Sequence, residues 1–171
     1  MTKKGRIDYE NGQYYEGEYI ERDGKKLAHG CGIQFIKPDM YCVGEFKDDE
    51  LNGKGRCVYP DGSHFEGDFK NHQPDGFAKI FWTNGDRFEG EVKGWNAERH
   101  GKFYFAEGGW YEGGFDKDGS KSGYGVMTDG KGTIFEGEFN CDYPVRGFLS
   151  RPGETRKEAT YDRETKKFKE D

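Results

Sequence analysis

A short motif returns along the chain at a nearly constant interval. YEGEY begins at residue 15 and is followed by CVGEF at 42, FEGDF at 65, FEGEV at 88, YEGGF at 111 and FEGEF at 135. The third residue of each stretch is a glycine: Gly17, Gly44, Gly67, Gly90, Gly113 and Gly137. These glycines are 27, 23, 23, 23 and 24 residues apart. Such a period indicates a repeat architecture, in which each unit buries its apolar face with the help of its neighbours.

Each repeat has a second half that opens on a glycine-containing pair. HGCG stands at 29, NGKG at 52, DGFA at 75, HGKF at 100, SGYG at 122 and RGFL at 146. Aligned by these pairs, His29 and His100 occupy the same repeat site, and Phe103 takes the place of a glycine. Turns such as PDG at 60 and TNG at 83 reverse the chain tightly. Two short strands per repeat joined by turns predict a series of hairpins, a β-meander.

Side chains alternate within the expected strands. Tyr15, Gly17 and Tyr19 share one face, whereas Glu16 and Glu18 share the other. One face should therefore carry aromatic rings that lie over glycines of neighbouring strands. On the other face, acidic side chains of the first strand should pair with basic side chains of the second. The ring expected over Gly67 belongs to one of three residues: Phe65, Trp82 or Phe88.

This pattern resembles the MORN repeat, named for membrane occupation and recognition nexus. The resemblance rests on YxGxW-like openings, an HG or NG pair, GxG, and an NG or DG turn. The chain departs from the pattern at Cys42 and Val43, which replace a Tyr-Glu pair, and at Gly114, which replaces an acid. The resemblance implies an all-β fold: an elongated single antiparallel sheet, or β-meander solenoid, of about six two-stranded hairpin repeats with half-repeat caps. It also implies a non-enzymatic interaction scaffold, as in radial spoke heads of cilia, junctional membrane proteins and parasite cytoskeletal proteins.

The repeats define the expected domain limits. A MORN repeat array should span residues 1–150, with a half repeat at 3–14 and repeats starting near 15, 42, 65, 88, 111 and 135. The glycine period stops at Arg151. Residues 151–171 are therefore predicted to hold one degenerate capping strand around Ala159 to Asp162, followed by a charged C-terminal tail.

Composition and cysteine usage indicate a folded, soluble chain. With 32% hydrophobic and 35% charged residues the chain could be disordered, but 16% aromatic residues favour a fold whose apolar content sits in large rings. No apolar run suggests a membrane span or a signal peptide, so we expect a cytoplasmic protein. The four cysteines have no CxxC or paired metal spacing and are expected to be free thiols: Cys31, Cys42, Cys57 and Cys141.

No residue pattern predicts catalysis, a cofactor or a metal site. The chain has no GxxxxGK[ST] motif, and its glycine runs fall on hairpin turns rather than before a helix. The histidines have no recognisable nucleophile partner. Carboxylates of the EGE type recur in nearly every repeat and therefore form a solvated face, because an active site is a single place. The sequence predicts a protein that is not an enzyme.

Charge limits the classes of partner. The net charge is −6, and residues 38–150 hold 13 basic and 21 acidic residues. This balance disfavours nucleic acid and anionic lipid. The alternative function, a peripheral membrane adaptor that binds acidic phospholipid, depends on two basic clusters near the ends: Lys3, Lys4 and Arg6, and Lys166, Lys167 and Lys169.

Residues that break the repeat on the polar face are the candidates for partner binding. The apolar candidates are Val43, Phe77, Phe81, Tyr104, Tyr124, Val126 and Phe148, and the acidic rim consists of Glu66, Asp68, Glu89 and Glu91. A single sheet has no second layer to cover them, so they predict a docking strip for an apolar or basic helical segment. The family resemblance suggests that the assembly is cytoskeletal or ciliary, of an axonemal or radial-spoke-like kind. In the other interpretation, the sheet curls or the C-terminal tail folds back to cover these side chains.

Overall fold

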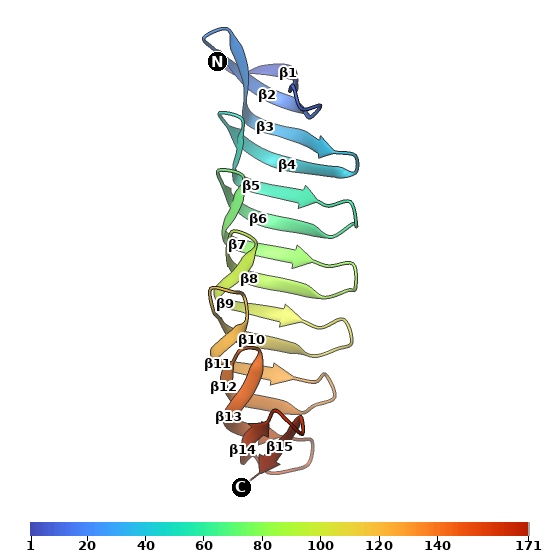
Figure 1. Cartoon of the computed structure of the whole chain (residues 1–171), viewed down its shortest axis with the longest axis vertical. Helices are drawn as coiled ribbons and strands as arrows, with labels where there is room; N and C mark the ends of the chain where they lie inside the picture. Colours follow the sequence, from blue (N-terminus) through green and yellow to red (C-terminus); the bar gives the residue numbers. More distant parts are fainter. Residues whose placement is uncertain (171) are drawn as a thin grey trace. The chain divides into compact units, whose positions relative to one another are not determined.

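The computed structural model describes residues 1–170, and this part of the chain contains strands but no helices. Fifteen strands form one antiparallel sheet in chain order, as Figure 1 shows. The predicted all-β meander is confirmed. The strands are β1 (Lys3–Asp8), β2 (Tyr14–Arg22), β3 (Lys25–Lys37), β4 (Met40–Lys47), β5 (Glu50–Val58), β6 (His64–Lys70), β7 (Gln73–Phe81), β8 (Arg87–Lys93), β9 (Asn96–Tyr104), β10 (Trp110–Phe115), β11 (Lys121–Thr128), β12 (Ile134–Asn140), β13 (Tyr143–Ser150), β14 (Lys157–Asp162) and β15 (Lys167–Glu170).

The chain divides into two compact parts. The N-terminal part comprises Met1–Thr83 and Lys93–Trp95, and the C-terminal part comprises Asn84–Val92 and Asn96–Asp171. The N-terminal part contains β1 to β7, whereas β9 to β15 and nearly all of β8 belong to the C-terminal part. Each part has its own set of buried aromatic rings, which follow the repeated motif.

A row of glycines crosses the strands of each part. In the N-terminal part, directly opposed positions are Gly5, Gly17, Gly32, Gly44, Gly55, Gly67 and Ala78. In the C-terminal part they are Gly101, Gly113, Gly125, Gly137, Gly147 and Ala159. Buried rings occupy the space that side chains would need: a Cβ on Gly32 would lie 2.2 Å from Cζ of Tyr15. The predicted packing of rings over neighbouring glycines is confirmed at Gly32, Gly101 and Gly125, but at Gly67 the nearest atoms belong to the backbone and side chain of the neighbouring strand. We call this surface the glycine face.

The strands bend next to this row because their register shifts there. Between β4 and β5, Gly44 opposes Gly55, but two residues later Phe46 opposes Leu51. The extra residues of β5 include Gly53, whose φ is 114°. That backbone conformation favours glycine, which explains the glycine of the NG pair.

The register corrects two expectations that came from aligning HG pairs. His29 lies three residues before Gly32 of the glycine row, whereas His100 lies directly before Gly101. The two histidines therefore do not share a repeat site. Phe103 opposes Tyr111 and takes an ordinary inward position rather than the place of a glycine. The two HG pairs have the same residues but different positions in the repeat. In β9, the position two residues before the row glycine is Arg99, whereas β3 and β5 carry Gly30 and Gly53 there.

Three hairpin tips bind the preceding repeat, each through one backbone N–H and one side-chain acceptor. Asp49 ends a tight turn with a φ of 71° and donates its N–H to Ala28 O, at 3.0 Å. Its Oδ1 accepts the Ala28 N–H, at 2.8 Å. His72 makes the same two contacts with Leu51, at 3.0 Å through its N–H and at 3.3 Å through Nδ1. Asp142 repeats them with Lys121, at 3.1 and 2.9 Å. We call this paired contact the tip clasp.

Acidic and basic side chains pair across strands on the opposite, polar face. Lys54 Nζ lies 2.6 Å from Asp68 Oδ1, and Lys102 Nζ lies 3.1 Å from Glu112 Oε2. Both pairs join the second strand of one repeat to the first strand of the next. The predicted cross-strand pairing is confirmed, and each exposed pair contributes little to stability.

The expectation of four free thiols is wrong for one pair. Cys42 and Cys57 form a disulfide whose Cα atoms are 4.1 Å apart, while Cys31 and Cys141 are free and exposed. The two bridged residues oppose each other because they flank the opposed glycines Gly44 and Gly55 at equal distance. The spacing of the cysteines along the sequence did not predict this pair, because the pairing depends on the register of β4 and β5.

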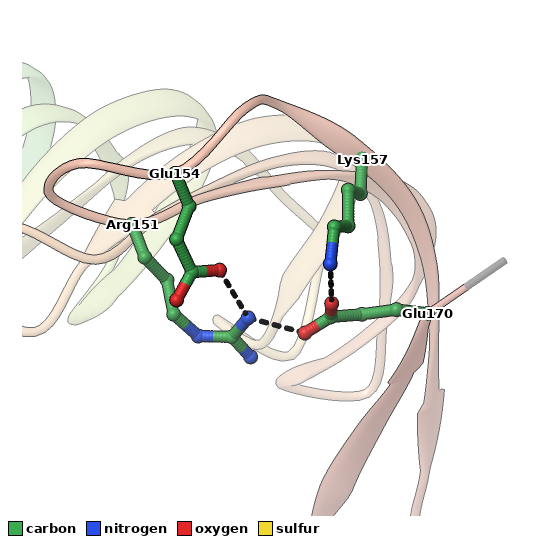
Figure 2. A network of polar contacts seen from close by, with 4 residues as sticks. All are labelled: Arg151, Glu154, Lys157 and Glu170. Carbon is green, nitrogen blue, oxygen red and sulfur yellow. Dashed lines mark hydrogen bonds and ion pairs between the residues drawn. The ribbon is translucent and has the colours of Figure 1, made fainter.

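The C-terminal segment adds two strands to the sheet. β14 includes the predicted degenerate strand, and β15 follows where a solvated tail was expected. The Phe168 ring of β15 stacks on Phe135, with centroids 5.0 Å apart. Figure 2 shows the guanidinium of Arg151 between the carboxylates of Glu154 and Glu170, with Lys157 on the second oxygen of Glu170, at 3.0 Å. The hydrogen bond from Arg151 has the largest effect in lowering the pKa of Glu170, and the one from Lys157 adds to it.

Candidate functional site

Apolar side chains line up on the polar face of the N-terminal part. Directly opposed positions in β2 to β7 carry Tyr14, Phe35, Tyr41, Val58, His64 and Phe81, which we call the aromatic row. Tyr14 stacks on Phe35 and His64 stacks on Phe81, with both pairs of centroids 4.5 Å apart. All six are half-buried.

Sequence comparison predicted only Phe81 of this row. The signal that would have found the rest is the residue directly before each repeated motif, which is Tyr14, Tyr41 or His64 in the first three units. These residues do not break the repeat pattern, so they do not stand out among the departures from it. Their strand partners complete the row only when the register is known.

The other candidates of the N-terminal part lie beside the aromatic row. Val43 is exposed and opposes Ile33, which enlarges the apolar surface. Phe77 is 52% exposed, and its N–H donates to Asp68 Oδ2, at 3.3 Å. The two rim carboxylates predicted here are already paired: Asp68 with Lys54, and Glu66 with Arg56, at 3.3 Å. The rim is therefore a ladder of ion pairs rather than free acid.

The candidates of the C-terminal part are covered to different extents. The Arg87 guanidinium lies 4.0 Å from the centroid of Tyr104, a cation–π contact that hides one ring face. Half-buried Val126 lies between Glu112 and Glu136 on neighbouring strands. The predicted rim residues Glu89 and Glu91 lie on β8, where Arg99 reaches Glu91 at 3.5 Å.

Tyr124 and Phe148 flank a groove of about 360 Å³ in the C-terminal part. Tyr124 is 61% exposed, and its hydroxyl donates to Glu136 Oε1 at 2.5 Å, which raises the pKa of the phenol. Arg156 lies over the Phe148 ring, 4.2 Å from its centroid. Glu138 also lines the groove, and the hydrogen bond from Arg146 lowers its pKa.

The structure thus assigns the predicted strip to two parts of the chain. Val43, Phe77, Phe81, Glu66 and Asp68 belong to the N-terminal part, and Tyr104, Tyr124, Val126, Phe148, Glu89 and Glu91 belong to the C-terminal part. The C-terminal segment covers little of the candidates: Arg156 lies over Phe148, whereas Phe168 of β15 packs against Phe135 on the glycine face. Phe77 and Tyr124 remain exposed.

Residues 1–170 show neither a metal-binding cluster nor a membrane-spanning helix. Within this range no three His, Cys, Asp or Glu side chains gather closely enough to hold a metal ion. The same residues include no helix that could span a membrane.

This geometry defines a repeat protein built from one β-meander sheet, with a packed glycine face and a polar face that carries apolar side chains. The MORN repeat model matches residues 42–64, 65–87 and 111–134, so the chain contains MORN repeats. Such repeats generally serve as modules for protein interaction or membrane association. No curated protein matches the chain in sequence.

A solved structure supports the fold. The TCP domain of SAS-4 (dCPAP) of Drosophila melanogaster, in complex with a proline-rich motif of Ana2 (dSTIL), is 14% identical to this chain, with a TM-score of 0.52. The match covers 92% of this chain and 89% of that chain. At this level of identity the likeness concerns the fold alone.

Proposed function

We propose that this chain is a non-enzymatic protein-interaction module that holds a helical segment of a partner on the polar face of its sheet. The observation that carries the proposal is the aromatic row, which ends at Phe81, on the same strand as exposed Phe77. Isolated apolar side chains are common on protein surfaces, but a continuous row across six strands forms a patch. An amphipathic helix could lay its apolar side along such a row.

Charge supports a partner with basic flanks. The chain carries a net charge of −6, and the acidic excess lies in the repeats. Long-range attraction would bring a basic segment to this face and orient it. The TCP domain of similar fold was solved with a motif of another protein, which supports a protein partner for a sheet of this kind.

We infer further that the module works as a scaffold or adaptor in a cytoplasmic, cytoskeletal or ciliary assembly. The support is the resemblance of its repeats to those of radial-spoke and cytoskeletal scaffolds. A reducing compartment would hold Cys42 and Cys57 as thiols, which suit buried positions as small apolar side chains.

The second candidate, a peripheral membrane adaptor, depends on the basic ends of the chain. Half of those six residues already have acidic partners: Lys3 with Glu21 at 2.8 Å, Arg6 with Asp8 at 2.8 Å, and Lys169 with Asp162 at 2.7 Å. This pairing leaves less charge for lipid and favours the protein partner. Sedimentation with phosphatidylserine vesicles at low salt tests the choice, and we expect the chain to stay in the supernatant.

Phe81→Ser tests the proposed surface. Partner capture should weaken by about 1 to 3 kcal/mol, the usual range for the loss of an aromatic anchor. We would compare proteins retained from a lysate of ciliated cells by mass spectrometry and follow melting by circular dichroism. Tyr143→Ser is the matched control, because this exposed ring lies outside the candidate set. Lower stability of Phe81→Ser with the same proteins retained would contradict the proposal.

A further inference from the structure

The β8–β9 hairpin lacks the side-chain half of the tip clasp. Trp95 stands 23 residues after His72, at the position that Asp49 and His72 use to accept a backbone N–H. The residue facing it is Pro74, which has no N–H to donate. The backbone contact moves back by one residue, so that the Gly94 N–H rather than the Trp95 N–H donates to Pro74 O, at 2.8 Å. The fold therefore assigns the Trp95 side chain no clasp contact.

The Trp95 side chain, which makes no clasp contact, borders an apolar groove. The Trp95 ring packs edge-to-face against Tyr59 and Phe65, with both centroid distances 5.9 Å, yet 53% of the residue is exposed. Together with Tyr59, Pro60, Phe65, Ile80 and Trp82 it lines a groove of about 560 Å³, which we call the tryptophan groove. This volume lies within the range of sites that bind ligands.

The groove offers hydrogen-bond donors that the chain does not use. Among residues 1–170, neither the Tyr59 hydroxyl nor the Trp95 indole N–H has a hydrogen-bond acceptor. Burial, with a smaller effect from Asp61, raises the pKa of Tyr59 to about 12, so its hydroxyl keeps its proton at neutral pH. Aromatic surface with free donors suits a ligand that is apolar and rich in acceptors.

We propose that the tryptophan groove binds a polyproline II segment of a partner protein. Proline rings pack well on aromatic faces, and grooves lined by aromatic side chains are a known mode of recognising such segments. A polyproline II helix has no internal hydrogen bonds, so its carbonyls are free to accept from Tyr59 and Trp95. An α-helix uses its carbonyls internally and would leave both donors unpaired.

Charge at the rim defines the segment further. The Asp61 carboxylate lies at the edge of the groove, and its hydrogen bonds with Ser63 lower its pKa, so it stays ionised. A lysine or arginine next to the prolines would pair with it. Phe65 and Ile80 lie on the glycine face, opposite the aromatic row. His64 of that row also borders the groove, so the two surfaces adjoin at His64 but lie mainly on opposite faces. The N-terminal part would then hold two different segments, as an adaptor does.

The test uses a fluorescein-labelled oligoproline peptide that ends in arginine. Fluorescence anisotropy should show saturable binding to the full chain and weaker binding of a glycine–serine peptide of the same length and charge. Trp95→Ala should reduce oligoproline affinity by about tenfold or more, as expected for an aromatic anchor. Trp110→Ala, which removes an indole from the C-terminal part, should leave the affinity unchanged.

A second variant separates binding from folding. Pro74→Ala combined with Trp95→Asp places an N–H and a carboxylate acceptor at the positions that Ala28 and Asp49 occupy in the clasp. This variant should melt no lower than the wild type and should not bind the peptide. Equal binding of both peptides, or unchanged affinity in Trp95→Ala, would overturn the proposal. Trp95-dependent binding to vesicles or to a second copy would also overturn it, whereas the Phe81→Ser result would still stand.

Discussion

Gly67 explains why positions in the glycine row do not accept a side chain. A Cβ there would lie 2.5 Å from the carbonyl oxygen of Phe77 and 2.9 Å from Cβ of Ala78. The obstacle is the neighbouring strand, not the ring of Phe65, Trp82 or Phe88 that sequence alternation suggested. Close approach of two backbones, more than ring packing, fixes glycine at this position.

Gly67→Val should therefore lower the free energy of unfolding by about 2 kcal/mol or more, the upper range for overpacking. Urea unfolding followed by circular dichroism measures the loss. Gly5→Val is the matched control, since Gly5 lies on the terminal strand β1. A Cβ there would lie 3.1 Å from the edge of the Tyr19 ring, a side chain that can move. We expect a smaller cost there. A Gly67→Val midpoint equal to that of the wild type would disprove this account of the glycine row.

Among the elements, the tip clasp joins neighbouring hairpins in addition to the pairing of their strands. Asp49 Oδ1 accepts from Ala28 N–H at 2.8 Å and from the Tyr9 hydroxyl at 3.0 Å. Asp49→Gly removes this acceptor without backbone strain, because glycine readily adopts a φ of 71°. The expected loss is about 1.5 to 3 kcal/mol, the range for hydrogen bonds to a charged group.

Two neighbouring substitutions control this prediction. Asp49→Asn keeps an oxygen acceptor and tolerates the left-handed conformation, so it should retain most of the stability. Asp48→Gly removes an exposed partner of Arg22 and should cost less than about 1 kcal/mol. If Asp49→Gly and Asp48→Gly lower the urea midpoint equally, the clasp has no special role.

How far the sequence predicts the elements depends on the range of each interaction. The period of the motif and the alternation of side chains predict the meander and its two chemically distinct faces, because both are local features of the sequence. The disulfide of Cys42 and Cys57 and the row from Tyr14 to Phe81 depend on strand register, which bulges shift within each hairpin. The clasp joins residues 21 positions apart, so it depends on the fold that brings Asp49 beside Ala28 and not on any local pattern.

At the scale of the whole molecule, the two faces divide stability and recognition between them. Buried rings and opposed glycines pack on the glycine face, and apolar burial is the main source of stability in a fold of this kind. The ion pairs of the polar face are exposed and contribute little. Substitutions on the polar face can therefore change binding while leaving the fold intact.

Because repeats depend on their neighbours, damage at one end should remain local. Deleting residues 163–171 removes β15 and uncovers Phe135, which Phe168 otherwise covers. Exposing much of such a ring should cost about 1 to 3 kcal/mol in the C-terminal part. The tryptophans report on the two parts separately: Trp110 belongs to the C-terminal part, and Trp82 and Trp95 belong to the N-terminal part.

Urea unfolding by tryptophan fluorescence measures this in two backgrounds. In Trp82→Phe/Trp95→Phe, where Trp110 is the remaining indole, the deletion should lower the unfolding midpoint. In Trp110→Phe, the same deletion should leave the midpoint of Trp82 and Trp95 where it was, because nearest-neighbour packing does not carry the loss that far. Equal shifts in both backgrounds would mean that the sheet unfolds as one cooperative unit, and stability would then be a property of the whole array rather than a sum over repeats.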